Sequence, residues 1–450
     1  MFIGRTQELE RLNGLYASER SGIMVLYGRS GIGKTALVRR FMQGKTAAYY
    51  AARRVTTEEQ LLCMKREWKT EEATDFYEAL TSFYDAKYDG GKLVLVFDEF
   101  RNLVEDSQEF LSAFLRFYAE HHGDGSLLVV FLSSSISWVE NEMTAVLGNA
   151  TRLLNGFIKL KELSFMELAG YHKDSSVRDN IYTRAVMGGV PGYLRLWREK
   201  DGFKENVMRL FLSEDAPFYG EAELYLKKEL RELSAYNTIL AALAEGKYKL
   251  NDIYAHTGFS RAKISVYLKN LTELDCTEKI FSFDTEDPRS VQKGLYRIRE
   301  PFLRFWYRFI YPNMSEIALG NAEQVYDTAI APYLAAYVRE TFCDVCGEYL
   351  QVMNRYNQLE GRYGSFGGWY GKAGKIDVVA KTEDGTYLVG FCDCGKEKTE
   401  LSVLEQYQSI LDSAGIKPGE WYCFSMEGFT EECNEAAKTA GIRLVAAKDM

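Results

Sequence analysis

Apolar and polar positions alternate between strand-like and helix-like spacing in the first third of the chain. Continuous apolar runs of strand length occur at residues 23–27, 93–97 and 127–132, and residues 47–55 give a weaker strand signal. Between them, residues 36–42, 72–88 and 110–117 have the apolar spacing of helices. Short, wholly apolar strands that alternate with helices are typical of a parallel sheet covered on both faces. The pattern therefore predicts an α/β fold for this part of the chain.

The pattern changes beyond residue 163. Strand signals fade as far as residue 230 and short helices are expected, the first capped by Ser164 with Glu167 three residues later. Residues 236–271 carry three helical segments, and residues 277–298 read as two strands around a charged turn. Helical spacing returns at 313–358. Strand signals at 375–380, 386–392 and 420–425 then predict a second α/β unit.

Composition narrows the protein classes that fit these patterns. The chain has 450 residues, 46% of them hydrophobic and only 7 of them Pro, so we expect three or four packed domains rather than a disordered or fibrous protein. The net charge of −9 argues against a general nucleic-acid coat. No apolar stretch reaches the length of a membrane span, the first residues lack an apolar signal core, and the 8 Cys are scattered. A cytoplasmic protein without membrane contact is the expectation.

The most specific motif is the glycine-rich sequence GRSGIGKT at residues 28–35. It fits the phosphate-binding pattern G-x-x-x-x-G-K-[ST], with an apolar strand before it and a helix after it. Backbone N–H groups of such a loop and the helix N-terminus would surround the phosphates of ATP. Lys34 would reach the β- and γ-phosphates, and the Thr35 hydroxyl would coordinate Mg²⁺. The expected nucleotide-binding positions are Gly28, Arg29, Ser30, Gly31, Ile32, Gly33, Lys34, Thr35 and Ala36.

Two acidic residues follow the buried strand at 93–97. We expect Asp98 to hold Mg²⁺ through water and Glu99 to polarise the attacking water, which makes ATP hydrolysis a stronger prediction than binding alone. The strand at 127–132 ends in three serines, and Ser134 is the candidate for contact with the γ-phosphate or the water. The catalytic candidates are therefore Glu99, Lys34, Asp98 and Ser134.

Residues 251–271 have the pattern of a helix-turn-helix. Gly258 occupies the tight turn and Ser260 caps the second helix, from which Arg261, Lys263 and Lys269 are expected to face solvent as candidate DNA contacts. Residues 279–283 and 294–298 would form the strands of a wing. Residues 236–300 contain ten basic and nine acidic side chains, which is weak for a DNA clamp. DNA contact and a role as a packing module both remain open.

Several of these segments together resemble the archaeal-type AAA-like ATPases, a branch close to the signal-transduction ATPases with numerous domains. The resemblance rests on FIGR with EL at residues 2–9, LYGRSGIGKT, VFDEF, GGVPGYL at 188–194 and YRIREPFLRFW at 296–306. It implies that Phe2, Ile3, Gly4 and Arg5 lie beside the adenine and that Gly189 and Pro191 belong to a lid facing the nucleotide. The corresponding arginine-rich motif is degraded here, which leaves Arg152 as a candidate arginine finger.

The same family usually ends in a restriction-endonuclease-like fold, whose chemistry needs a helical acid, a strand Asp and a Glu-x-Lys. Asp377 matches the strand Asp, but Phe391 and Asp393 stand where the Glu and Lys are expected, and Cys343 stands where the helical acid is expected. We therefore expect nuclease activity to be lost, with the fold serving binding or scaffolding. A zinc site of Cys343, Cys346, Cys392 and Cys394 is a second reading, and buried apolar thiols are a third.

The sequence thus predicts four domains. They are a P-loop ATPase core at 1–158, a helical lid at 159–230, a winged helix at 231–312 and an endonuclease-like α/β domain at 313–450. The expected function is an ATP-hydrolysing, Mg²⁺-dependent switch, with DNA, a protein partner or further copies of the chain as candidate partners. Two alternatives stay open: a nucleotide-gated DNA-binding regulator with negligible turnover, and an ATPase-linked metal-dependent nuclease.

Overall fold

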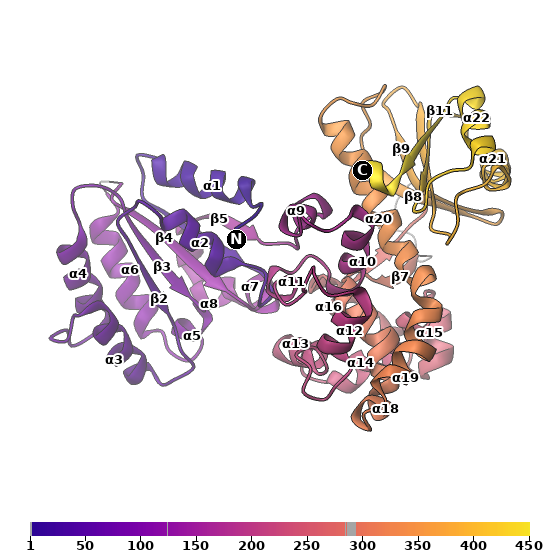
Figure 1. Ribbon diagram of the computed structural model, residues 1–450. Helices are drawn as coiled ribbons and strands as arrows, with labels where there is room; N and C mark the ends of the chain where they lie inside the picture. The colour runs from indigo at the N-terminus through magenta and orange to yellow at the C-terminus, as the bar shows by residue number, and fades with distance from the viewer. Residues whose placement is uncertain (1, 124, 284, 286–293) are drawn as a thin grey trace. The chain divides into compact units, whose positions relative to one another are not determined.

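The computed structural model of the chain describes residues 2–123, 125–283, 285 and 294–450 (Figure 1). The chain divides into two compact units. The first consists of Met1–Leu163 with Val190–Tyr193, and the second of Ser164–Gly189 with Leu194–Met450. Within the described residues, none of the helices combines the length and apolar character of a membrane span.

The first unit is built on a parallel five-stranded sheet in the order β2-β3-β4-β1-β5 (Figure 1). Every residue of the three central strands is buried, which explains their unbroken apolar sequences. Only Ile158 of the edge strand β5 is buried, and the sequence pattern did not predict this strand. The strands are β1 (Gly22–Tyr27), β2 (Ala47–Ala51), β3 (Leu93–Asp98), β4 (Leu127–Ser133) and β5 (Leu154–Lys159).

Helices connect the strands of this sheet and cover it. Thr56 caps α3 and Asp75 caps α4, each accepting a backbone N–H of the first turn. An aromatic cluster fills the space between α4, α6 and the sheet, with the rings of Phe76 and Phe110 5.4 Å apart and Phe97 against Phe110 at 5.3 Å. The helices are α1 (Thr6–Ala17), α2 (Lys34–Met42), α3 (Thr57–Trp68), α4 (Phe76–Lys87), α5 (Arg101–Val104), α6 (Glu109–His121), α7 (Ile136–Asn141), α8 (Met143–Leu147) and the 3₁₀ helix η1 (Gly148–Leu153).

The second unit begins with short helices. The capping box predicted at Ser164 and Glu167 is present at the start of the first of them. The helices are α9 (Phe165–Tyr171), α10 (Val177–Met187), α12 (Phe203–Phe211) and α13 (Glu221–Glu229), while the single turn α11 (Pro191–Leu194) falls at the boundary of the two units.

A helix-turn-helix with a two-stranded wing follows. It comprises α14 (Leu233–Ala244), α15 (Leu250–Thr257), α16 (Arg261–Glu273) and the antiparallel strands β6 (Thr277–Ile280) and β7 (Leu295–Ile298). Gly258 adopts φ +70° at the turn, and the Ser260 hydroxyl accepts the Lys263 N–H, as predicted. Most of the charged turn expected between the two strands lies outside the described residues.

A nearly continuous helical run leads into the last part of the unit. Two π turns interrupt it, and each is followed by a 3₁₀ turn that contains a proline, whose missing N–H breaks the regular ladder. The segments are α17 (Pro301–Phe305), η2 (Trp306–Ile310), η3 (Tyr311–Asn313), α18 (Met314–Ala318), α19 (Ala322–Val325), η4 (Tyr326–Ile330), η5 (Ala331–Tyr333) and the long α20 (Leu334–Arg355).

The chain ends in a mixed sheet of order β12-β11-β10-β9-β8, so the second α/β part is present as predicted. β10, β11 and β12 are parallel, whereas β8 and β9 are antiparallel to their neighbours. Apolar residues of α20 pack on one face, and those of α21 and α22 pack in a separate cluster. The elements are β8 (Phe366–Gly371), β9 (Gly374–Lys381), β10 (Tyr387–Asp393), α21 (Leu401–Ala414), β11 (Pro418–Ser425), α22 (Glu431–Ala440), β12 (Ile442–Ala446) and η6 (Ala447–Asp449).

Candidate functional site

The glycine-rich loop lies between the end of β1 and the first turn of α2. Gly31 and Gly33 have φ +80° and +100°, conformations that favour glycine. A side chain at Gly28 would come within 2.8 Å of the Leu160 carbonyl oxygen, so space also requires glycine there. Conformation at Gly31 and Gly33 and space at Gly28 therefore explain why the motif has glycine at these three positions.

Lys34 is folded back over this loop. Its Nζ donates to the Gly28 carbonyl at 2.7 Å and to the Arg29 carbonyl at 3.2 Å, and the residue is only 5% exposed. The ammonium is therefore held inside the concave side of the loop, where phosphate oxygens are stronger acceptors than neutral carbonyls.

The acidic pair lies where the sequence predicts, at the carboxyl end of β3. The Thr35 hydroxyl donates to Asp98 Oδ2 at 3.2 Å, which brings together two oxygen groups of the kind that Mg²⁺ prefers. Tyr49 on the adjacent strand β2 donates its hydroxyl to the same oxygen. Burial, followed by the bond to Asp98, raises the pKa of Tyr49 above its ordinary value, so the phenol remains a donor. No sequence pattern identifies Tyr49, because its position beside Asp98 depends on the pairing of β2 with β3.

Glu99 and Ser134 are also brought together. Glu99 has φ +50°, an unusual conformation for a non-glycine residue. Its carboxylate accepts the Ser134 hydroxyl and, at 3.4 Å, the Ser134 backbone N–H. The ends of β3 and β4 therefore present an acid and a hydroxyl beside the loop.

The N-terminal segment contacts the loop through Arg5. Its Nη2 donates to the Ile32 carbonyl at 3.1 Å and to the Lys161 carbonyl at 2.6 Å, and Arg5 is 6% exposed. Phe2, Ile3 and Gly4 are half-buried. Arg5 thus fixes the segment beside the loop, while adenine contact remains a prediction.

Residues Val190–Tyr193 pack directly on the loop within the first unit. The Gly192 N–H donates to the Gly31 carbonyl at 2.9 Å, and a side chain at Gly192 would lie 2.9 Å from the Gly31 Cα. The Arg29 guanidinium donates to the Tyr193 hydroxyl at 2.7 Å and lies 5.1 Å from the centre of that ring. The sequence motif predicts a role in phosphate binding for the backbone of Arg29 but not for its side chain. Pro191 lies near Gly33, within 3.8 Å of where a side chain at Gly33 would begin.

The three basic candidates on α16 are exposed, but each has a neighbour. Arg261 donates to the Asn251 side-chain oxygen at 2.9 Å, and Lys263 lies 4.4 Å from the centre of the Phe259 ring. Lys269 forms an ion pair with Glu273 at 3.7 Å.

In the C-terminal domain, helix α20 and strands β9 and β10 bring Cys343, Asp377 and Cys392 together, with their ligand atoms within 4.8 Å of one another. The Asp377 carboxylate already accepts from Lys375 at 2.8 Å and from Arg339 at 3.1 Å. A metal ion would compete with both cations.

The remaining thiols and the nuclease positions of this domain have other surroundings. Cys394 points to the Ala335 carbonyl at 3.8 Å. The ring of Phe391 is buried against Tyr407, and Asp393 accepts the Thr399 hydroxyl at 2.6 Å. Neither residue supplies the Glu or Lys of the nuclease pattern.

Three segments match known protein families. Residues 2–196 match an ATPase domain found predominantly in Archaea, residues 237–275 match the bacterial regulatory protein arsR family, and residues 306–401 match archaeal and bacterial proteins of unknown function. The chain therefore carries a P-loop ATPase domain and an arsR-type helix-turn-helix.

Individual proteins are similar as well. The uncharacterized protein MJECL04 of Methanocaldococcus jannaschii is 28% identical over 85% of both chains, and the uncharacterized ATP-binding protein MJ0423 of the same organism is 38% identical over 10% of this chain and 76% of its own. Among solved structures, the Walker-type ATPase PABY2304 of Pyrococcus abyssi is 15% identical, with a TM-score of 0.49 over 68% of this chain and 96% of that one.

Proposed function

We propose that the chain binds Mg²⁺·ATP at residues 28–35 and hydrolyses it as a conformational switch. The observation that carries the proposal is the meeting of two bonded pairs at the carboxyl ends of β3 and β4: Thr35 with Asp98, and Ser134 with Glu99. Thr35 and Asp98 fit the oxygen chemistry of Mg²⁺, and that ion would neutralise phosphate charge. Glu99 would accept a proton from the attacking water while Ser134 holds the carboxylate in place.

Lys34 would give up its loop carbonyls to reach the β- and γ-phosphates. Those two hydrogen bonds keep the ammonium in place without nucleotide, and charged phosphate oxygens are the better acceptors. Arg5 and Pro191 support the same site, because both segments pack on the loop.

The test separates binding from turnover with Glu99→Gln. We expect the variant to bind ATP with unchanged affinity but to lose most of its hydrolysis, about 10²-fold or more, since a general base contributes that much. Glu72→Gln, on an exposed loop residue of the same unit, is the matched control. Turnover unchanged by Glu99→Gln would remove Glu99 from the mechanism. No ATP binding by the unaltered chain would refute the proposal itself.

The second candidate is a nucleotide-gated DNA-binding regulator with negligible turnover. The outer face of α16 favours it: Val266 is 57% exposed, and at about 100° per residue Lys263 and Lys269 lie about 60° to either side of it. An apolar side chain between two lysines matches thymine-methyl contact flanked by phosphate contacts. Arg261 lies about 140° from Val266 on the same basis, outside this face.

A DNA-shift assay over a salt series tests the α16 face. If it binds DNA, Lys263→Ala and Lys269→Ala should each reduce the salt slope by about one. The control is Lys228→Ala, an exposed lysine on α13. Absence of a shift at low salt would leave the winged helix as a packing module. Tight ATP binding with turnover at background, together with a shift, would favour this second candidate over the first.

We further propose the four-domain division at residues 158, 230 and 312, with the C-terminal domain acting in binding or scaffolding rather than as a nuclease. The Asp377 carboxylate bonded to Lys375 and Arg339 supports loss of the metal chemistry. Plasmid cleavage in Mg²⁺ or Mn²⁺ would contradict it. Arg152, exposed on η1, is the candidate arginine finger for a neighbouring copy. Solution mass with and without ATP tests whether copies assemble.

A further inference from the structure

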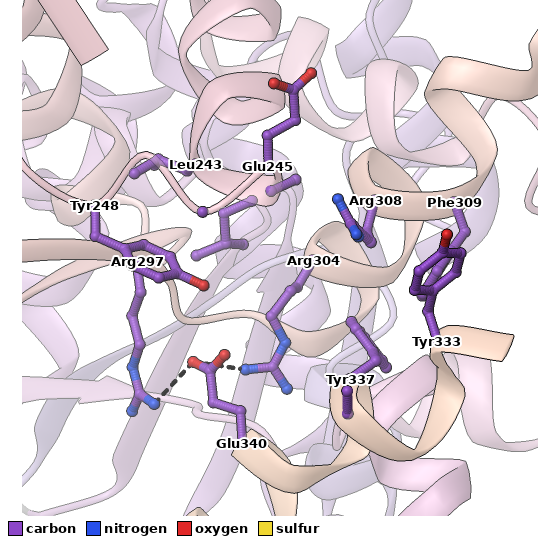
Figure 2. Close-up of a pocket in the computed structure, with 14 residues that line it drawn as sticks. Leu243, Glu245, Tyr248, Arg297, Arg304, Arg308, Phe309, Tyr333, Tyr337 and Glu340 are labelled. Atoms are coloured by element: carbon purple, nitrogen blue, oxygen red, sulfur yellow. Dashed lines mark hydrogen bonds and ion pairs between the residues drawn. The ribbon is translucent and has the colours of Figure 1, made fainter. Parts of the chain in front are cut away.

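A cavity of about 240 Å³ lies inside the second unit, apart from the ATPase residues. Arg297, Ile298 and Arg304 of the run YRIREPFLRFW line part of it, and the proposed ATPase cycle assigns this run no role (Figure 2). Its walls come from the end of α14 and the following turn, from β7, from α17 with η2, and from η5 with α20. The lining residues used below are Tyr248, Arg297, Arg304, Arg308, Phe309, Tyr333, Ala336, Tyr337, Glu245 and Glu340.

The floor of the cavity is an ion-pair network. Glu340 accepts from Arg297 at 2.9 Å and from Arg304 at 2.9 Å, as the dashed lines in Figure 2 mark. Burial alone would raise the pKa of Glu340, but the two arginines lower it below its ordinary value, so it stays ionised. Arg297 also bonds Asp344 at 3.0 Å and Glu278. The two floor arginines are thus compensated within the protein.

One donor of this network has no acceptor. The Nε–H of Arg304 is buried and finds no hydrogen-bond partner among the described residues, although Arg304 is only 7% exposed. Leaving such a group unpaired costs free energy, about 1–3 kcal/mol, more when the group is charged. The atom itself is almost fully covered, so an acceptor in the cavity would remove this cost after a small shift of the Arg304 side chain.

Arg308 supplies the charge that the network does not compensate. Its guanidinium carbon lies 5.9 Å from the centre of the Phe309 ring and 6.0 Å from that of Tyr333, and over the described ranges it forms no ion pair. Glu245, the remaining lining acid, points away from the arginines in Figure 2 and lies 3.8 Å from His256. The cavity therefore offers one uncompensated cation beside one unpaired donor.

The rest of the lining combines small and aliphatic residues with four aromatic side chains, Tyr248, Phe309, Tyr333 and Tyr337. Tyr333 is 52% exposed and Tyr248 is 42% exposed, so both present ring surface to an incoming molecule. The Tyr337 hydroxyl already donates to the carbonyls of Ala185 and Pro301 at 2.8 and 3.2 Å. Small-molecule sites combine such apolar surface with a few polar groups, and about 240 Å³ is slightly below their usual range of roughly 300–1,000 Å³.

We propose that this cavity binds a small organic anion with a planar ring. The anionic group is held by Arg308 and the Arg304 Nε–H, and the ring lies against Tyr333 and Tyr248. β7 of the wing and α20 of the C-terminal domain both line the cavity, so the bound anion connects the winged helix to that domain. The cavity is an effector site, independent of whether the chain hydrolyses ATP.

Fluorine NMR of 4-fluorobenzoate with the full-length chain tests the proposal. A carboxylate probe is preferable to a phosphate, which would also bind at residues 28–35. We expect 4-fluorobenzoate to bind, and 4-fluorophenol and 4-fluorobenzylamine to bind at least tenfold more weakly. Arg308→Gln should weaken 4-fluorobenzoate about tenfold or more, since a charge-assisted bond is lost. Arg231→Gln, at an exposed arginine of the same unit, should change nothing.

Ala336→Phe gives a second variant that keeps every charge. Ala336 is an exposed residue of α20 that lines the cavity, so a larger side chain there should block the probe without disturbing the ion pairs. This variant decides the question if Arg308→Gln does not fold. Three results would each overturn the proposal. They are tighter binding of 4-fluorobenzylamine than of 4-fluorobenzoate, equal affinity of 4-fluorobenzoate for the unaltered chain and the variants, and no binding of 4-fluorobenzoate at about 10 mM, a concentration above the dissociation constants of ordinary ligand sites.

Discussion

Tyr49→Phe removes one hydroxyl from the acidic end of β3 and leaves the ring in place. In the native protein, Asp98 accepts three bonds: the Tyr49 and Thr35 hydroxyls at Oδ2, and the Glu99 N–H at Oδ1 at 2.9 Å. Asp98 is only 8% exposed, so water cannot readily replace the lost donor. The substitution therefore weakens the support of the residue proposed to hold Mg²⁺.

The size of the effect follows from the bond that is lost. A hydrogen bond to a charged group contributes about 1.5–3 kcal/mol, and Asp98 keeps two other donors, so we expect about 1.5 kcal/mol, the lower end. For a unit of this size, each kcal/mol shifts the melting temperature by about 2–4 °C, which gives a decrease of about 3–6 °C. Looser support of Asp98 should also raise the KM for Mg²⁺·ATP.

Calorimetry with and without Mg²⁺·ATP measures this decrease, because the transition that the nucleotide raises belongs to the unit that binds it. Tyr77→Phe is the matched control: it deletes the same kind of bond, to Glu120 at 2.5 Å, on the exposed surface. Its effect should stay within about 0.5 kcal/mol. Equal melting temperatures and equal steady-state hydrolysis for Tyr49→Phe and the unaltered chain would refute a supporting role for Tyr49.

Two further substitutions test the contacts described above. Gly192→Ala places a methyl group 2.9 Å from the Gly31 Cα, so we expect about 1–3 kcal/mol of destabilisation and weaker ATP binding, measured by thermal unfolding and nucleotide titration. Glu340→Gln leaves Arg297 and Arg304 without their shared carboxylate. We expect the free energy of unfolding to fall by about 2 kcal/mol at pH 7, a value between those typical of exposed and of buried ion pairs. The pKa of Glu340 is lowered in the folded protein, so its ionised carboxylate stabilises the fold at pH values above the unfolded pKa of about 4.3. This stabilisation is lost as the pH falls through the folded pKa. In urea unfolding, the free energies of the variant and the unaltered chain should therefore converge in acid.

Each of these tests has a control in the chain. Gly14→Ala adds a methyl group that meets nothing within 4 Å in the interior of α1, where alanine is favoured, so it should not destabilise. Unaltered unfolding of Gly192→Ala would show that the Val190–Tyr193 segment can move away at no cost. A stability difference for Glu340→Gln that stays constant from pH 7 to about pH 3 would show that ionisation of Glu340 contributes nothing.

The sequence predicts local chemistry well and long-range placement poorly. The strands of the ATPase sheet and the phosphate loop were predicted, because unbroken apolar runs and a motif with fixed spacing are encoded over a few residues. The edge strand β5 was missed, since only one of its six residues is buried and little apolar periodicity is required. Tyr49 was missed for a different reason: its neighbour Asp98 is reached only through strand pairing.

Arg29 is a further long-range contact that the sequence does not predict, and it bears on the proposed switch. Its backbone carbonyl holds Lys34, while its side chain holds Tyr193, 164 residues away in sequence. Phosphate binding would release the Lys34 ammonium from the Gly28 carbonyl of the loop. The same loop accepts the Gly192 N–H at its Gly31 carbonyl. The Val190–Tyr193 segment is covalently continuous with the second unit on both sides. A change in the loop would therefore act on a short segment that is joined at both ends to the second unit, which gives the proposed switch a physical route.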